Sequence, residues 1–128
     1  MSPSPPLGDL QLAILRILWS RGEASASDVH SALKRDLAPT TVSTMLAKME
    51  KRGLVRHRTE GRRFLYEATL SETETHEKLV GNLVEKLYSG DPAGLVNHLL
   101  KYAEIDPDEL VRLRSLISKK LKDARSEA

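Results

Sequence analysis

The sequence predicts a mainly α-helical protein with one small β-hairpin and a further helical region towards its C-terminal end. Apolar residues recur with the 3.6-residue period of an amphipathic helix in six separate segments, and the period changes to two between residues 54 and 68. Helix-start signals stand at residues 71 and 106, each ahead of an aliphatic run. We therefore expect a disordered tail at residues 1–6, one domain at 7–70, and a helical region at 71–128.

The first two helices are expected to be short and amphipathic. The first covers Asp9–Arg21, with Trp19 as a packing residue at the edge of the apolar stripe. That stripe consists of Leu10, Ala13, Ile14, Ile17 and Leu18. The second covers residues 27–36, because Ser25 and Asp28 have the spacing of a capping box, which satisfies the free N–H groups of a helix start.

The third helix has two contrasting faces. It is expected over residues 39–52, because proline is favoured in a first turn and Gly53 is a natural stop. Its apolar face holds Val42, Met45, Leu46 and Met49. Its opposite face holds Thr40, Thr41, Ser43, Thr44 and Lys48. Such short hydroxyl side chains either contact a partner at close range or simply cap and solubilise the helix.

A basic hairpin follows. Residues 54–59 and 63–68 alternate between apolar and polar, and residues 60–62 supply the turn, so Arg62 and Arg63 lie at its tip. The whole chain has a net charge of only +2, yet residues 48–63 hold seven basic side chains and two acidic ones. A patch of this kind attracts polyanions, although a charge run alone is more often a solvated face.

Short helices followed by a basic hairpin form the layout of a winged helix-turn-helix domain. In this layout the helix at residues 39–52 fits the major groove of DNA, where small hydroxyl side chains let its axis approach the base edges. The hairpin tip then places Arg62 and Arg63 at a flanking phosphate or the minor groove. We therefore predict DNA-binding residues in two places: Thr40, Thr41, Ser43, Thr44 and Lys48 on the helix, and Arg62 and Arg63 on the hairpin.

Three aliphatic helices are expected after residue 70, breaking near residues 89–92 and 104–106. They are too few and too short to cover their own apolar stripes, so we favour pairing with a second copy over folding back on the first domain. The predicted dimerisation residues are Leu83, Leu87, Leu95, Leu99, Leu113 and Ile117.

Several functions are disfavoured by what the sequence lacks. It has no cysteine and no histidine pair at metal-ligand spacing, so neither a metal nor another cofactor is expected. Phosphate-loop and hydrolase motifs are missing, so we expect no enzyme. No apolar run approaches the length of a membrane span and residues 1–6 do not resemble a signal peptide, which favours a cytoplasmic protein. A winged-helix protein-interaction module stays the alternative.

Several stretches of the chain resemble the penicillinase-repressor family, which includes the methicillin-resistance repressor and copper-responsive repressors. They are TTVSTMLAKMEKRGLV at 40–55 with FLY at 64–66, Leu10 with LRILW at 15–19, and GLV at 94–96 with DEL at 108–110. The resemblance spans about residues 7–122. It implies a homodimeric repressor whose protomers each bind one half-site of a palindromic double-stranded DNA operator.

The same resemblance implies two routes of regulation. In the β-lactam branch a membrane sensor-protease acts upstream, and the repressor is cut at an Asn-Phe bond in its dimerisation region. The corresponding pair here is His98-Leu99, a departure from that pattern that leaves cleavage and the β-lactam link open. The copper branch binds metal through a cysteine near the C-terminus, and this chain has none.

Overall fold

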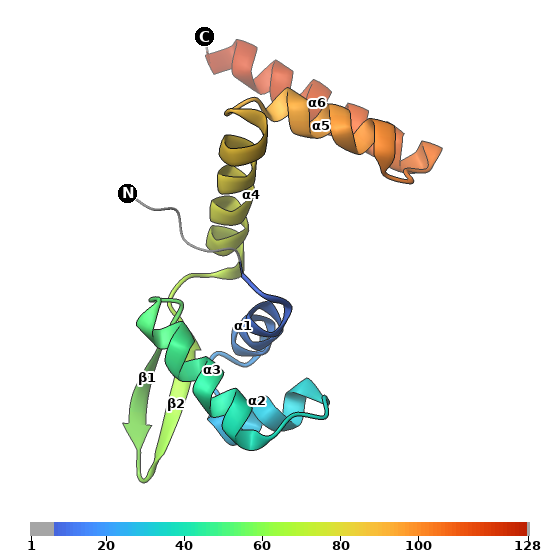
Figure 1. Cartoon of the computed structure of the whole chain (residues 1–128). Coiled ribbons are helices and arrows are strands. Elements are labelled where there is room, and N and C mark those ends of the chain that lie inside the picture. The colour runs from blue at the N-terminus through green and yellow to red at the C-terminus, as the bar shows by residue number, and fades with distance from the viewer. Residues whose placement is uncertain (1–6, 128) are drawn as a thin grey trace. The chain divides into compact units, whose positions relative to one another are not determined.

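The computed structural model describes residues 7–127, so the tail expected at residues 1–6 lies outside the described residues. The elements follow in the order α1 (Asp9–Arg21), α2 (Ala26–Leu33), α3 (Pro39–Lys51), β1 (Val55–Glu60), β2 (Arg63–Ala68), α4 (Glu72–Tyr88), α5 (Pro92–Tyr102) and α6 (Pro107–Glu127) (Figure 1). The predicted class, mainly helical with one antiparallel hairpin, is confirmed. The chain divides into two compact units, Met1–Asn82 and Leu83–Ala128.

A single core holds the first unit together. α1, α2 and α3 pack against one another and against the hairpin (Figure 1), and each contributes side chains that are almost fully buried. They are Ile14, Leu15 and Leu18 from α1, Val29 from α2, and Val42, Leu46 and Met49 from α3, with Val55 and Tyr66 from the hairpin. Leu15 falls outside the predicted stripe, because α1 contacts both α2 and β2 and is therefore buried over a wider arc.

The ends of the helices follow local rules with small departures. α2 stops at Leu33, three residues before the expected end, where Lys34 adopts a left-handed conformation with φ of 53°. α3 ends at Lys51 and α5 at Tyr102, each slightly before its expected end. The predicted capping box at Ser25 and Asp28 is confirmed: Asp28 N donates to Ser25 Oγ at 3.1 Å, and Ser25 N donates to Asp28 Oδ2 at 3.2 Å.

The hairpin is tight and is tied to the helices. β1 pairs with β2 from Val55 opposite Ala68 to Glu60 opposite Arg63, so the turn has two residues, one fewer than expected. Gly61 is the first of these, with φ of 63°, a conformation that costs glycine little. Ala24, between α1 and α2, exchanges backbone hydrogen bonds of 3.0 and 2.8 Å with Tyr66. This bridge fixes the hairpin to the helical layer.

The helices of the second half begin at the predicted caps. Ser71 N donates to Glu74 Oε1 and Glu74 N to Ser71 Oγ, both at 3.1 Å, ahead of α4. Glu109 N donates to Asp106 Oδ1 at 2.8 Å at the start of α6. Among residues 7–127, no helix combines the length and the apolar character needed to cross a membrane.

The capping box of α2 gives a stability prediction. Hydrogen bonds from Ser25, first from its backbone and then from its side chain, lower the pKa of Asp28. We expect Ser25→Ala to cost about 1 kcal/mol of unfolding free energy at neutral pH, as N-cap losses commonly do. A carboxyl whose pKa is lowered by folding stabilises above its unfolded pKa and loses that contribution as the pH falls through its folded pKa. The cost should therefore shrink at about pH 2.

Urea unfolding at the two pH values measures this difference, and Ser27→Ala, at an exposed position of the same helix, is the matched control. An equal loss of stability in Ser25→Ala at both pH values would contradict the linkage to Asp28.

Candidate DNA-binding and dimerisation surfaces

The outward face of α3 carries the predicted hydroxyl residues. Thr40, Thr41, Ser43, Thr44 and Lys48 are all exposed, as is Ala47 among them. The opposite face is anchored, because Val42, Leu46 and Met49 have no exposed surface. Burial of one face at a 3.6-residue period therefore turns the hydroxyl face towards solvent.

These hydroxyl groups neither cap α3 nor form side-chain hydrogen bonds within residues 7–127. The N-cap of α3 is Ala38, which has no capping side chain, and Pro39 occupies the first turn. Within residues 7–127, the four hydroxyl groups form no hydrogen bond to protein. Of the alternative that they only cap and solubilise the helix, the capping part is wrong, and their donors and acceptors face solvent.

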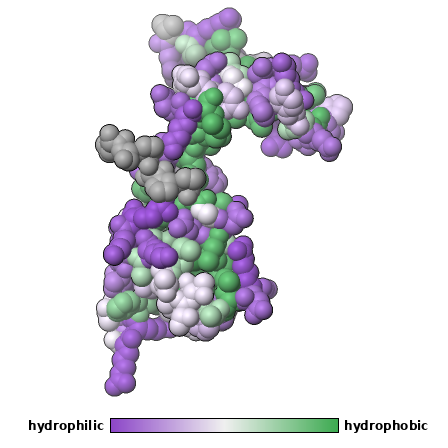
Figure 2. Space-filling model, in the orientation of Figure 1, coloured by the Kyte–Doolittle hydropathy of each residue, from purple (hydrophilic) through white to green (hydrophobic). Residues whose placement is uncertain are grey.

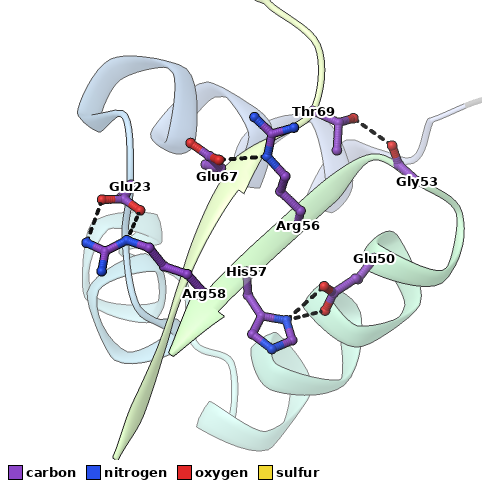
Figure 3. A network of polar contacts seen from close by, with 8 residues as sticks. All are labelled: Glu23, Glu50, Gly53, Arg56, His57, Arg58, Glu67 and Thr69. Carbon is purple, nitrogen blue, oxygen red and sulfur yellow. Dashed lines mark hydrogen bonds and ion pairs between the residues drawn. The ribbon is translucent and has the colours of Figure 1, made fainter. Parts of the chain in front are cut away.

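Ion pairs divide the basic patch into two groups of side chains. On β1, Arg56 Nε lies 2.6 Å from Glu67 Oε1, and Arg58 Nε lies 2.7 Å from Glu23 Oε2 (Figure 3). Arg58 also lies 3.0 Å from Glu60, and the hydrogen bond from Arg58 lowers the pKa of Glu23. These two arginines already have carboxylate partners, on the hairpin and at Glu23 between α1 and α2, so their charge is largely compensated within the protein.

The remaining cations lie on α3 and at the hairpin turn. Lys48, Lys51, Arg62 and Arg63 form no ion pair within residues 7–127, whereas Arg52 Nη1 donates to Gln11 Oε1 at 3.0 Å. The sequence alone gives no reason to distinguish among the seven basic residues of the patch. The structure separates the cations that have protein partners from the four that offer their charge to a polyanion.

A histidine links the hairpin to α3. His57 Nδ1 lies 2.7 and 2.8 Å from the carboxylate oxygens of Glu50, the acidic residue near the end of α3 (Figure 3). The His57 ring stacks on Phe64 with centroids 4.1 Å apart. Burial raises the pKa of Tyr66 beside them, and Glu50 raises it further. Sequence reasoning missed the Glu50 contact, because no local period relates residues on a helix to residues on a strand.

A hollow of about 490 Å³ lies between α2, α3 and the hairpin. Ser27 and Asp28 line it from α2, Ser43 from α3, and Arg62 and Arg63 from the hairpin. Arg63 lies beside the hairpin turn, and it also lines this recess next to α2. Its charge contributes to lowering the pKa of Asp28.

The predicted dimerisation residues lie at the end of α4 and on α5 and α6. Leu83, Leu87, Leu99, Leu113 and Ile117 are exposed, with 67% of Leu87 and 58% of Ile117 accessible, and Leu95 is half-buried. Neither α5 nor α6 contains a buried residue. Figure 2 shows hydrophobic residues at the surface over these helices. An apolar surface of this extent, left uncovered, indicates an interaction site.

The predicted cleavage pair lies within α5. His98 is exposed, and its ring contacts Tyr102 at 4.7 Å between centroids and Tyr88 at 6.4 Å. Leu99 is 45% exposed, and its carbonyl oxygen accepts a hydrogen bond from Ala103 N at the end of the helix. Among residues 7–127, no group of three His, Asp or Glu side chains could hold a metal ion.

The division of the basic patch gives a prediction about salt. We expect Arg62→Ala to weaken binding to any duplex DNA and to reduce the slope of log affinity against log salt by about one, because each phosphate contact releases counterions. Arg58→Ala is the matched control and should leave that slope unchanged, since Arg58 is paired with Glu23 and Glu60. Titrations of one labelled duplex at several salt concentrations measure both slopes. Equal slopes of log affinity against log salt for Arg62→Ala and Arg58→Ala would refute the division into paired and unpaired cations.

Comparisons with known proteins agree with this architecture. The family model "Penicillinase repressor" matches residues 7–119. The methicillin resistance regulatory protein MecI of Mammaliicoccus sciuri is 26% identical over 109 residues, which cover 84% of this chain and 89% of that protein. Transcriptional regulator BlaI of Mycobacterium tuberculosis is 36% identical over 91 residues, 69% of this chain and 64% of that one. The solution structure of the DNA binding domain of the repressor BlaI has a TM-score of 0.50 at 28% identity, covering 58% of this chain and 93% of that domain. The chain belongs to the penicillinase repressor family.

Proposed function

We propose that this protein is a transcriptional repressor that binds a palindromic DNA operator as a homodimer and acts in the cytoplasm. One observation carries the proposal: the hydroxyl groups of α3 are exposed and without protein partners, and unpaired cations flank them on the same compact unit. Membership of the penicillinase repressor family supports it, as do relatives named as a resistance regulatory protein and a transcriptional regulator. We further propose that residues 7–70 bind DNA and that residues 71–128 hold the dimer.

The face of α3 suits the major groove. Thr40, Thr41, Ser43 and Thr44 bear hydroxyls that donate to or accept from a base edge, and their small size lets the helix come close. Lys48, four residues after Thr44 on the exposed face, then reaches the sugar-phosphate backbone. In this arrangement the hydroxyls read sequence and the lysine adds affinity.

The hairpin and its hollow suit a phosphate of the flanking backbone. Arg62 and Arg63, which form no ion pair within residues 7–127, bring two guanidinium groups to a recess that Ser27, Ser43 and the carboxylate of Asp28 also line. Guanidinium groups form two parallel hydrogen bonds with phosphate oxygens and carry a full charge. These contacts are independent of sequence, so the hairpin supplies affinity for all duplex DNA.

A second copy of the chain is the proposed cover for the helices after α4. Without a buried residue of their own, α5 and α6 have too little packing to hold their helical form in isolation. Closed two-fold pairing would bury the aliphatic positions of both copies at once. A dimer also brings the second DNA-binding domain to its half-site at high effective concentration.

Proteolysis in the dimerisation region is a further part of the proposal. A cut at His98-Leu99 would divide α5 and detach α6 with Leu113 and Ile117. Because α5 has no fully buried residue within one protomer, its local unfolding costs little in a protomer that has separated from its partner, and the bond can then reach a protease. A membrane sensor-protease is the upstream partner that the family resemblance implies.

The function is tested first by base readout. Duplexes that bind the full chain are selected from a random pool, and the selected operator is titrated against Thr41→Val/Thr44→Val. Valine keeps the shape and removes both hydroxyls, so we expect a loss of about 1–3 kcal/mol for each specific base contact. Thr73→Val, at an exposed position of α4, is the control. A pool with no enriched sequence would favour the protein-interaction module. Unchanged operator affinity in the folded double variant would show that these hydroxyl groups do not contact the bases.

The dimer is tested by Leu99→Asp. A carboxylate at this position would lie unpaired in an apolar interface, at a cost that exceeds the contacts it replaces. We expect a folded first unit, a shift towards monomer and a sharp loss of operator affinity, measured by sedimentation velocity and titration of one sample. Asn97→Asp adds the same charge at an exposed position two residues away and should stay dimeric. Tight binding to the full operator by a monomeric Leu99→Asp variant would show that operator affinity does not depend on dimerisation.

A further inference from the structure

Glu50 is the one acidic residue of α3, and it lies beside the exposed face of that helix. Ser43, Ala47 and Glu50 fall at positions i, i+4 and i+7, so Glu50 continues a stripe that begins on the solvent-facing surface. Its side chain is 33% exposed. A carboxylate is disfavoured here, because the last turn of a helix already carries partial negative charge. In the proposed complex it would also repel the phosphates of DNA.

His57 of β1 lies directly against this carboxylate. Its Nδ1 is 2.7 and 2.8 Å from the two oxygens of Glu50, whereas Arg56 and Arg58 on the same strand pair with carboxylates elsewhere (Figure 3). The imidazole is held from β2 as well, because it stacks on Phe64 with ring centroids 4.1 Å apart. The contact thus joins α3 and the hairpin within the first compact unit.

The charge of this pair depends on one proton. Histidine is the side chain that ordinarily changes charge between about pH 5 and 8. The pair is negative while the imidazole is neutral, and the charge is cancelled when the imidazole is protonated. On β2 the titratable group beside the imidazole is Tyr66, with ring centroids 5.5 Å apart. Burial and then Glu50 raise the pKa of Tyr66, so its hydroxyl stays neutral over this range.

We propose that the Glu50–His57 pair takes up a proton when the chain binds DNA, so that operator affinity rises as the pH falls from about 8 to about 6. The inference rests on the DNA-binding function proposed above. Phosphates beside α3 would add to the helix terminus and the Glu50 carboxylate in favouring the charged imidazole. The protonated pair also places no net negative charge next to the DNA.

The direction of the effect follows from linkage. If the complex holds the proton more tightly than the free protein, the gain in affinity is fully present at a pH where the free protein is already protonated. The gain is lost as the pH rises through the range in which the complex itself releases the proton. The pair therefore weakens DNA binding in alkaline solution and strengthens it in mildly acidic solution, without any change in the residues that contact the bases.

The first test titrates the full chain with its selected operator at pH 6, 7 and 8 and one salt concentration. We expect the wild type to bind about tenfold more tightly at pH 6 than at pH 8. His57→Gln keeps an amide that donates to Glu50 but takes up no proton, so it should lose most of this rise. His76→Gln removes another histidine of the first unit, at an exposed position of α4, and should keep the rise.

A second variant tests the carboxylate. Glu50→Gln keeps an oxygen that accepts a hydrogen bond from His57 and removes the charge. We expect it to bind the operator about threefold more tightly than the wild type at pH 8, because the charge that repels phosphate is gone. Glu72→Gln removes the same charge at an exposed position of α4 and should bind like the wild type. Circular dichroism first checks that each variant is folded.

Calorimetry of the wild type counts the protons without any variant. Titration at pH 7 in two buffers with different ionisation enthalpies should show proton uptake on binding, and His57→Gln should show less. No uptake by the wild type would overturn the inference, as would an equal rise in affinity in folded His57→Gln or unchanged affinity of Glu50→Gln at pH 8. Each of these results leaves operator binding itself intact. A wild type that binds no operator at any pH overturns the proposed function as well.

Discussion

Burial of one face of α3 is the constraint on which the rest of the DNA-binding unit depends. Val42, Leu46 and Met49 are fixed in a core shared with α1, α2 and the hairpin, so the helix cannot rotate about its axis without exposing them. The hydroxyl face is consequently held outward by packing, although its hydroxyl groups form no hydrogen bond within residues 7–127. A rigid scaffold of this kind lets side chains meet a partner in a fixed register, which is what recognition of a base sequence requires.

The same core positions the hairpin, and polar contacts further fix the orientation of the hairpin relative to the helices. The backbone bridge between Ala24 and Tyr66 attaches β2 to the helices, and the Glu50–His57 contact attaches β1 to α3. A third contact, the Arg58–Glu23 ion pair, joins β1 to the segment between α1 and α2. The outward ion pairs of Arg56 and Arg58 lie on the other side of β1, so they stiffen the hairpin without crowding the face near α3.

Local patterns in the sequence predicted most of the fold. The apolar period gave α3 its two faces, alternation gave the hairpin, and the capping boxes at Ser25 and Ser71 were placed correctly because their partners are three residues away. Contacts between distant residues could not be predicted in this way. Glu23 with Arg58 and Trp19 with Leu70 lie 35 and 51 positions apart, and only the packed chain brings them together. For this reason the sequence overestimated the free charge of the basic patch and assigned Trp19 to packing alone.

The separation of hydroxyls from cations on the DNA-facing unit has a kinetic consequence. In the proposed complex with DNA, Lys48, Arg62 and Arg63 would attract any duplex through its phosphates, whereas the neutral hydroxyls of α3 would gain little from a wrong sequence and suffer no charge penalty there. A repressor built in this way stays near DNA between sites and moves along it by sliding and hopping, held by charge alone. It stops where base edges match the hydroxyl groups. The search for one operator in a genome then runs largely along the DNA, and the cations that read no sequence determine how quickly the operator is found.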